Sequence, residues 1–388
     1  GTFITQNKVL PGAYINVVSS TNASVSFGER GTVAAAVMLP TGRQGIFTVT
    51  NDQIQSDSIK EFGYSYGSQQ MKNIRELFRH AQIVHFYNIK TEGQKASNTY
   101  ATALYGGIYG NQLKIRIEAD PDDENRLIVS TLFENNVVDE QRIKKVEGSS
   151  TTNNGLTDNE YVTFKKDVVP AATAATPLSG GTDGEYSEPL LQNALTAFEG
   201  VSFNVLFSDC KSTETSAIIS YTNRMRNEYG KKIQAVIHDG NHSLKPDNEG
   251  IISVLNTVKD GSTETNCDLV YWTAGALAGC QINQSLTNTV YDGEYEINTD
   301  YSQVQLEEFI KAGYFVFHKV NNDVRVLMDI NTLVTVTPEK GEVFKANQSI
   351  RVLDQIVNDI ASLFNTKYLG QSPNDNAGRI ALWNDIVN

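Results

Sequence analysis

The sequence has 388 residues, of which 40% are hydrophobic and 20% charged, and its formal net charge is −13. This length allows two or three domains with ample core, and the composition is ordinary for a globular protein. The acidic balance argues against a general nucleic-acid binder and against attachment to anionic membranes. No apolar stretch approaches the length of a membrane helix, so we expect no membrane insertion.

The three cysteines, Cys210, Cys267 and Cys280, are widely spaced and form no CxxC pair. An odd count without that motif argues against a disulfide framework, and we expect three small buried side chains. The first eight residues lack the basic and then apolar pattern of a signal peptide.

Residues 1–20 are expected to form an extended arm, in which residues 13–18 have the apolar content of a strand but no local partner. Residues 21–92 are expected to form the first part of a core domain. Apolar runs predict strands at 32–39, 46–50 and 81–89. Apolar residues three and four positions apart predict a helix over 68–80.

Residues 93–178 are predicted to form an inserted, mostly antiparallel β domain. Apolar and charged residues alternate over 113–119, which is the pattern of a half-exposed strand. Further strands are expected at 127–133, 137–146 and 160–164, and no helix is expected between 95 and 170. The stretches 170–177 and 179–184 have the composition of a linker back to the core.

Glycines at two places indicate structural turns, at Gly107, Gly110 and Asn111 and again at Gly180 and Gly181. The first group has the look of a phosphate-binding loop. However, a strand follows it, so the helix N-terminus that would bind a phosphate is missing. A tight turn with positive φ is the expectation.

Residues 179–388 alternate helices with strands, which predicts a largely parallel sheet covered on both faces. We expect helices at 190–198, 213–229, 268–280 and 302–311. Strands are expected at 203–207, 233–237 and 251–255, with a hairpin over 314–330. The fold class is therefore α/β and multi-domain, with a core built from N- and C-terminal parts around the β insert.

A long amphipathic helix is predicted over 343–368, because apolar residues recur there at steps of three and four. Asn347 and Ser349 are candidate N-caps for this helix, and Gly370 with Pro373 predicts its end. A strand is expected before it at 333–336, and a short helix after it around Trp383.

No catalytic constellation is found, because the nucleotide-binding, nucleophile-elbow and zinc-protease motifs are absent. His238 and His242 flank Asp239 after a predicted strand, but no ligand cluster accompanies them, so a polar turn is the better interpretation. Residues 120–124 are acidic but lack the glycine and glutamate of a calcium loop. We therefore expect no cofactor and no metal, and no enzymatic activity.

The chain resembles the contractile tail sheath proteins of bacteriophages, and most closely the small sheath proteins of Gram-positive phages, prophages and phage-tail-like bacteriocins. Matching blocks occur in the same order along nearly the whole chain. They are PGAYI at 11–15, ERGTVA at 29–34, YGGIYGNQL at 105–113, PLSGGTDG at 177–184, KKIQAV at 231–236, TAGALAG and NQSLT within 273–287, and DINTL, TPEKG, DNAGR and WND within 329–385.

The resemblance implies a structural subunit that polymerises helically around a tail tube and contracts to drive the tube through a target cell envelope. The implied partners are other copies of the chain, the tail tube protein, and baseplate and tail terminator proteins. The implied location is a virion tail or a phage-tail-like particle assembled in the host cytoplasm. The family's arms insert as strands into neighbouring subunits, and the residues placed in such an arm here are Ala13, Tyr14, Ile15, Val17 and Val18.

The helix over 343–368 is the candidate tube-facing region, with Lys345, Arg351 and Lys367 as its contact residues. Family members usually continue with a further C-terminal segment, so we expect a C-terminal arm to be absent after residue 388. The alternatives are a sheath of a bacteriocin or another contractile injection particle, a tail-tube or baseplate protein, a secreted surface module, and an α/β enzyme without a recognised motif.

Overall fold

A seven-stranded sheet in the order β13-β12-β11-β10-β1-β3-β2 forms the centre of the computed structural model. The structure describes residues 30–145, 155–209, 215–259 and 267–387. The predicted arm and Cys210 therefore lie outside the described residues. The strands are β1 (Thr32–Val37), β2 (Ile46–Thr50), β3 (Ile83–Asn88), β10 (Val205–Ser208), β11 (Gln234–His238), β12 (Ile251–Val254) and β13 (Tyr314–Phe315).

Neighbouring strands of this sheet are parallel, except that β2 runs antiparallel to β3. Strand β1 lies between β3, which precedes the insert, and β10, which follows it. The core is therefore built from both sides of the insert, which confirms the predicted α/β fold class.

The two faces of the sheet contribute to two different apolar clusters. On β1, Val33, Ala35 and Val37 join one apolar cluster, whereas Ala34 and Ala36 join another. This split follows from the two-residue period of a strand. Small side chains on both faces let helices approach closely, so β1 suits the middle of the sheet.

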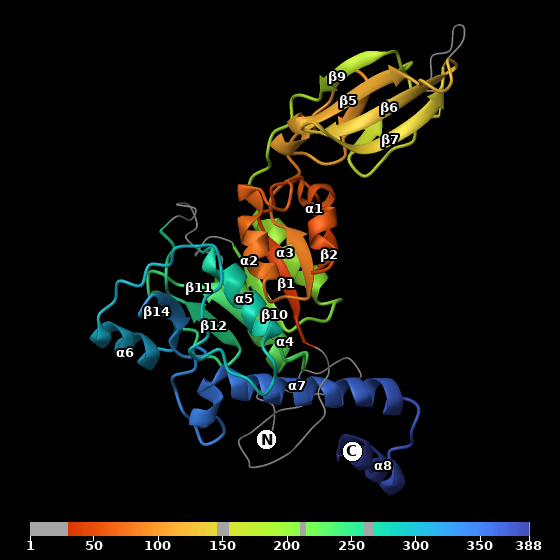
Figure 1. The fold of residues 1–388 in the computed structure, drawn as a ribbon. Helices are drawn as coiled ribbons and strands as arrows, with labels where there is room; N and C mark the ends of the chain where they lie inside the picture. The colour runs from red at the N-terminus through yellow and green to blue at the C-terminus, as the bar shows by residue number, and fades with distance from the viewer. Residues whose placement is uncertain (1–29, 146–154, 210–214, 260–266, 388) are drawn as a thin grey trace.

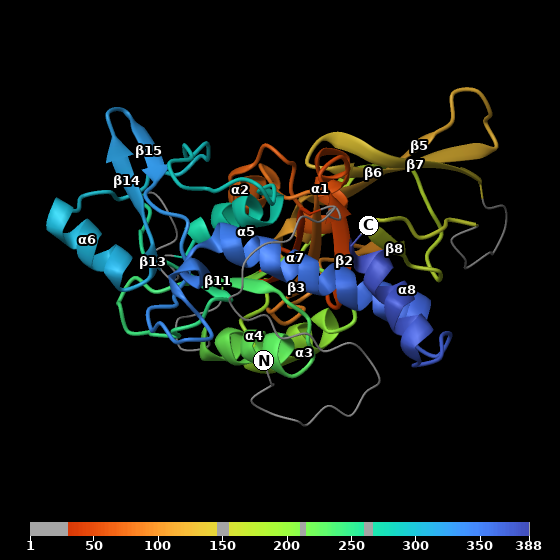
Figure 2. The same ribbon diagram turned by 90° about the horizontal axis from the view of Figure 1, so that it is seen from below.

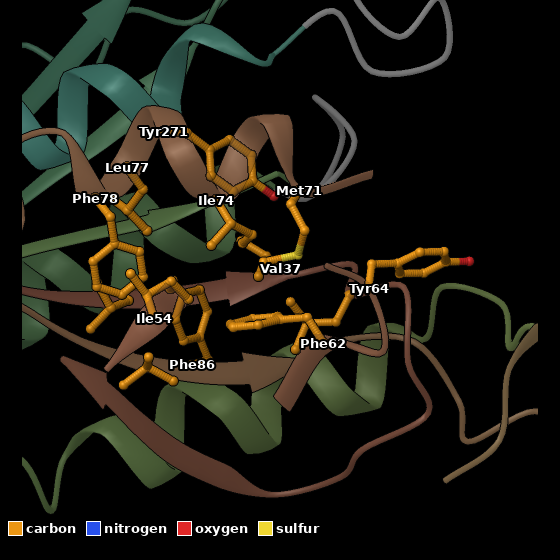
Figure 3. Close-up of a cluster of buried hydrophobic side chains, with 14 of the residues drawn as sticks. Val37, Ile54, Phe62, Tyr64, Met71, Ile74, Leu77, Phe78, Phe86 and Tyr271 are labelled. Carbon is orange, nitrogen blue, oxygen red and sulfur yellow. The ribbon is translucent and has the colours of Figure 1, made fainter. Parts of the chain in front are cut away.

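Helices cover both faces of the sheet (Figure 1). Cluster residues place α1 (Ile54–Phe62), α2 (Lys72–Phe78) and α5 (Leu269–Gly279) on one face, and α3 (Glu188–Phe198) and α4 (Thr215–Asn227) on the other. Figure 3 shows aromatic and aliphatic side chains from α1 and α2 meeting Phe86 of β3 and Tyr271 of α5. Helix α1 was missed by the sequence analysis, because its apolar residues are sparse.

Helices α2 and α5 pack closely because two glycines of α5 face the backbone of α2 and the residues after it. A Cβ at Gly275 would lie 2.4 Å from the carbonyl oxygen of Leu77, and one at Gly279 would lie 2.3 Å from that of His80. The small-residue composition predicted for this helix therefore has a direct packing role.

The insert consists of antiparallel strands at one end of the molecule (Figure 1). One sheet has the order β7-β6-β5-β9, and β4 pairs with β8 in a second. The prediction of a linker at 170–177 is wrong, because β9 pairs with β5 around a bulge. The strands are β4 (Ala101–Ala103), β5 (Leu113–Ala119), β6 (Arg126–Phe133), β7 (Asn136–Lys144), β8 (Val162–Phe164) and β9 (Thr173–Pro177), and the short 3₁₀ helix η2 (Ile108–Gln112) precedes β5.

Helices α7 and α8 lie at the opposite end of the molecule from the insert (Figure 1). After α6 (Gln303–Lys311) and the hairpin β14 (Phe317–Val320) and β15 (Asp323–Val326), the chain reaches α7 (Asn347–Leu363), one π-helical turn (Phe364–Tyr368) and α8 (Asn376–Val387). The long amphipathic helix and the short second helix are therefore present as predicted. The short 3₁₀ helices η1 (Gln69–Met71) and η4 (Glu342–Lys345) precede α2 and α7.

Two local predictions at this end are wrong. Residues 333–336 form no strand, because the amides of Val334 and Thr335 donate to the Asp247 carboxylate at 2.7 and 3.0 Å. Neither Asn347 nor Ser349 is an N-cap, since both lie within α7 and its N-cap residue is Ala346. The Asn347 side chain is instead buried among the groups described below.

Candidate functional site

The first turns of α7 are held to the core by a buried ion pair. The Arg351 guanidinium donates to Oδ2 of Asp329 at 2.8 Å, and both side chains are 0% exposed. Asn347, one turn earlier, donates to Oδ1 of the same carboxylate at 2.9 Å. Leu286 N also donates to Oδ2 at 3.0 Å, so the carboxylate joins α7 to two other segments.

A second buried ion pair lies one turn further along α7. Arg226 of α4 donates both terminal nitrogens to Asp354, at 2.6 and 2.9 Å. Glu249 lies 3.7 Å from Arg226 and accepts from Lys340 at 2.8 Å. Burial disfavours the charged form of Glu249, but Arg226 and Lys340 together hold the pKa of Glu249 below its ordinary value. The two ion pairs place α7 at the end of the sheet where its parallel strands begin.

Three residues of the 343–368 region were predicted to face a partner, and the structure separates them. The prediction for Arg351 is wrong, because its side chain is buried against Asp329 and presents no charge to a partner. Lys345 is partly exposed and pairs with Glu342 at 3.0 Å. Lys367 is 59% exposed and pairs with Asp385 of α8 at 2.6 Å. Only the two lysines remain candidates for a surface contact.

Helix α8 has no buried residue, and three of its apolar side chains face solvent. Ile380, Trp383 and Val387 are exposed, with Trp383 at 67%. Asp385 ties α8 back to the core side through Lys367 and the Tyr368 hydroxyl. Figure 2 shows α8 beyond one end of α7, and Figure 1 shows it on the side of α7 that faces away from the central sheet. An exposed apolar face of this kind is typical of a protein–protein contact.

The predicted glycine turns come together where the insert joins the core, which we call the neck (residues 39–44, 90–97, 104–111 and 178–187). Gly107 and Gly180 have φ of +129° and +84°, as expected for turns that need glycine. Gly181 and Asn111 bond reciprocally, at 2.9 and 3.0 Å. Gly110 lies beside them in η2 without positive φ, so its small size is what the site uses.

The candidate metal ligands have structural partners instead. His238 pairs with the carbonyl oxygen of Asn256 at 3.1 Å, and His242 packs against Phe309 and Tyr314. Asp239 accepts from Ser243 N and Leu244 N at 3.0 and 2.9 Å, so this stretch is a hydrogen-bonded turn. Within the described residues no group of three or more His, Cys, Asp or Glu side chains could hold a metal.

The sequence patterns did not reveal the buried charges, nor that Gly42 and Gly93 belong to the neck. Asn347, Arg351, Asp354 and Asn358 follow one another at steps of four and three, so they share a helix face. That spacing was the available signal, but polar faces are ordinarily assigned to solvent. Cys267 and Cys280 are buried, as predicted. No described helix is long and apolar enough to cross a membrane.

The projecting β insert, the parallel-sheet core and the C-terminal helices correspond to three recognised domains of one class of structural protein. Three family profiles match successive parts of the chain: the phage tail sheath protein beta-sandwich domain at 91–183, the central domain at 184–332 and the C-terminal domain at 339–388.

Relatives of known sequence and structure agree with these matches. The chain is 34% identical to the phage-like element PBSX protein XkdK of Bacillus subtilis over 393 residues, covering 93% of this chain and 81% of that protein. The crystal structure of a sheath tail protein from Desulfitobacterium hafniense superposes with a TM-score of 0.79 at 31% identity, covering 96% and 87% of the two chains.

The chain therefore belongs to the phage tail sheath family and is a structural subunit of a contractile tail sheath. The fold is also that of the helical sheath of the anti-feeding prophage, seen in its contracted state. That likeness has a TM-score of 0.55 at 11% identity, covers 98% and 82% of the two chains, and extends to the fold alone.

Proposed function

We propose that the chain polymerises helically around a tail tube, and that contraction of this polymer drives the tube through a target cell envelope. The observation that carries the proposal is the family relationship, which extends over 93% of the chain. A heterologous contact repeated by rotation and rise gives an open filament, which suits a sleeve around a tube. The particle would be a phage or a phage-tail-like particle, assembled in the host cytoplasm.

The subunit acts without chemistry in this proposal. Contraction draws on differences in packing between two arrangements of the same rigid subunits. A few kcal/mol per subunit, on the order of one good buried apolar cluster, becomes large when it is summed over many copies. Baseplate and terminator proteins then have the task of starting and stopping the rearrangement.

Two surfaces would form contacts between copies of the chain. The arm at residues 13–18, with Ala13, Tyr14, Ile15, Val17 and Val18, would add a strand to the sheet edge of a neighbour. The exposed face of α8, with Ile380, Trp383 and Val387, would be covered by a second copy. Covering three large apolar side chains stabilises by roughly 1.5–3 kcal/mol each when they become fully buried.

Electron microscopy of the protein in its natural full length tests this proposal. We expect sleeves or tubes from the unaltered chain, and their loss when Ile380 and Trp383 are both replaced by serine. The matched control is Val304→Ser, an exposed apolar side chain on α6. Monodisperse globules from the unaltered chain at high concentration would refute polymerisation. Normal sleeves from the double variant would refute only the assigned contact.

A further inference from the structure

Two chain segments cross the neck, and they pair with each other along its length. Antiparallel bridges join Lys90 to Tyr186, Gln94 to Thr182 and Ser97 to Ser179. At the middle bridge the amide of Gln94 donates to the Thr182 carbonyl oxygen at 2.9 Å, and the return bond measures 3.2 Å. The crossing is therefore a hydrogen-bonded ladder and not a pair of separate linkers.

Glycines bring this ladder against the core with no side chain between. A Cβ at Gly106 would lie 2.0 Å from the Glu92 carbonyl oxygen, and one at Gly42 would lie 1.9 Å from the same atom. A Cβ at Gly184 would lie 1.8 Å from the carbonyl oxygen of Thr91. Gly42 belongs to the core, and its amide donates to the Gly106 carbonyl oxygen at 2.7 Å. Three backbone segments thus meet where no larger residue fits.

A tyrosine of the insert also packs into the core at this point. The ring of Tyr109, in η2, lies against Gly63 at the end of α1, where a Cβ would come within 2.6 Å of it. Tyr109 is 4% exposed, and it belongs to the same apolar cluster as Phe62 of the core and Leu113 of the insert. The hydrophobic core is thus continuous through the neck.

The polar contacts around the neck are of two kinds. Asp183 accepts from the amide of Ile108 at 2.9 Å, so a side chain of one crossing segment caps η2. Lys60 of α1 and Glu160 of the insert form an ion pair at 2.5 Å, but both are solvent-exposed enough that the pair contributes little. The neck is therefore held by backbone bonds and packing, which salt does not screen.

We propose that the neck is a locked joint, which fixes the insert on the core so that the two move as one rigid body. Domains in one chain are ordinarily free to move unless their interface is large and apolar. Two glycine-containing linkers would ordinarily let the insert rotate relative to the core. Here three features prevent that rotation: the paired backbones, the close glycine contacts and the continuous apolar cluster. Any rotation of the core would therefore turn the insert by the same angle, out to its tip.

Distances between spin labels in the isolated chain test the proposal independently of sheath assembly. One label is placed by Glu140→Cys on β7 and the other by Asn193→Cys on α3, both exposed positions. The three native cysteines are replaced by serine. A label pair within the core, at Asn193 and Glu307 of α6, gives the reference width of the distance distribution. We expect the insert-to-core distribution to be no more than 1.5-fold as wide as the reference.

Glycine variants then test the cause. Gly106→Ala is expected to widen the insert-to-core distribution at least two-fold, because its Cβ displaces the Glu92 backbone. Gly67→Ala is the matched control, since Gly67 is exposed, has no positive φ and meets no atom within 4 Å. If Gly106→Ala does not fold, Asn111→Ala removes the bonds to Gly181 and is expected to widen the distribution in the same direction.

The proposal is overturned if the unaltered chain already shows an insert-to-core distribution more than twice the reference width. It is also overturned if the distribution is narrow but neither Gly106→Ala nor Asn111→Ala changes it. In that case contacts outside the neck would fix the insert. A narrow distribution that widens in either variant, with Gly67→Ala unchanged, supports the locked joint.

Discussion

Polar residues in the first half of α7 form a helix face that the sequence alone would assign to solvent. The polar stripe of Asn347, Arg351, Asp354 and Asn358 lies against the core, where each member has a partner. The partners, Asp329, Arg226 and the Lys232 backbone, are 18 to 128 residues away in sequence. Periodicity identified the helix, but no local pattern could show that distant groups would neutralise its polar side.

Replacing Arg351 is expected to destabilise the fold and not merely to weaken a surface contact. In Arg351→Met, Asp329 remains buried without its cation, so the free energy of unfolding should fall by about 3–5 kcal/mol. The control is Lys345→Met, which breaks a partly exposed ion pair and should cost about 0–1 kcal/mol. Urea unfolding followed by circular dichroism measures both, and equal small losses would contradict the buried pair's role.

Asp209 provides a pH-dependent contribution to stability. Its carboxylate lies at the end of β10, where the Met38 amide and the Tyr271 hydroxyl donate to it at 2.9 and 2.6 Å. Burial is the main cause that raises the pKa of Asp209 to about 6, because hydrogen bonding only partly offsets the cost of its charge.

A raised folded-state pKa means stability that is present at low pH and lost as pH rises through about 6. Comparison with Asp209→Asn isolates this effect. Between pH 4 and pH 7 the unaltered chain should lose about 2 kcal/mol of unfolding free energy relative to the variant. Urea unfolding at half-unit pH steps measures the difference. A difference that stays constant with pH would show that the carboxylate titrates normally.

At the scale of elements, strong periodicity predicted most of the structure. Alternation over 113–119 gave β5, and the small-residue run at 268–280 gave α5. Two failures have a common physical cause. Residues 173–177 form β9 although they are mostly alanine and threonine, and 333–336 remain irregular although they are rich in valine. The available partner decided both cases, since β9 pairs with β5 and Asp247 takes the amides of Val334 and Thr335.

Helix α8 is expected to be the least protected helix of the isolated chain. A 12-residue helix without buried residues is marginal in water, because nucleation is costly and no packing offsets it. Hydrogen exchange should therefore be fast throughout α8 and slow in the first three turns of α7, which carry both ion pairs. The control is α6, which is shorter but has a capping box and buried Phe309. Protection in α8 equal to that in α7 would contradict this account.

At the scale of the whole molecule, the parallel core with its inserted β domain was predictable because each element carries its own pattern. The tube-facing residues were not predictable in the same way. A surface for another chain has no periodic signature, and Arg351 has the residue type of a contact but the burial of a core group. The neck is similar, since single glycines indicate turns but cannot show which backbone lies opposite them.

Net charge leads to opposite salt effects on the two kinds of contact proposed for this chain. Copies that each carry −13 repel one another, so added salt should speed polymerisation by screening that repulsion. Contact with a tube through Lys345 and Lys367 would instead weaken with salt, because it relies on attraction between unlike charges. Light scattering measures polymerisation, and co-sedimentation with isolated tubes measures tube binding. Both are followed from about 0.02 to about 0.3 M salt, a range over which the screening length shortens strongly.

Charge reversal separates these effects. Lys345→Glu with Lys367→Glu should abolish the salt dependence of tube binding and reduce binding at low salt at least ten-fold. Lys319→Glu is the control, because it makes the same change at an exposed position on the β14–β15 hairpin. Tube binding that survives the double reversal but is lost with Lys319→Glu would move the tube contact from the α7 end of the subunit to the hairpin. Self-assembly that slows with salt would mean that ion pairs between copies outweigh their overall repulsion.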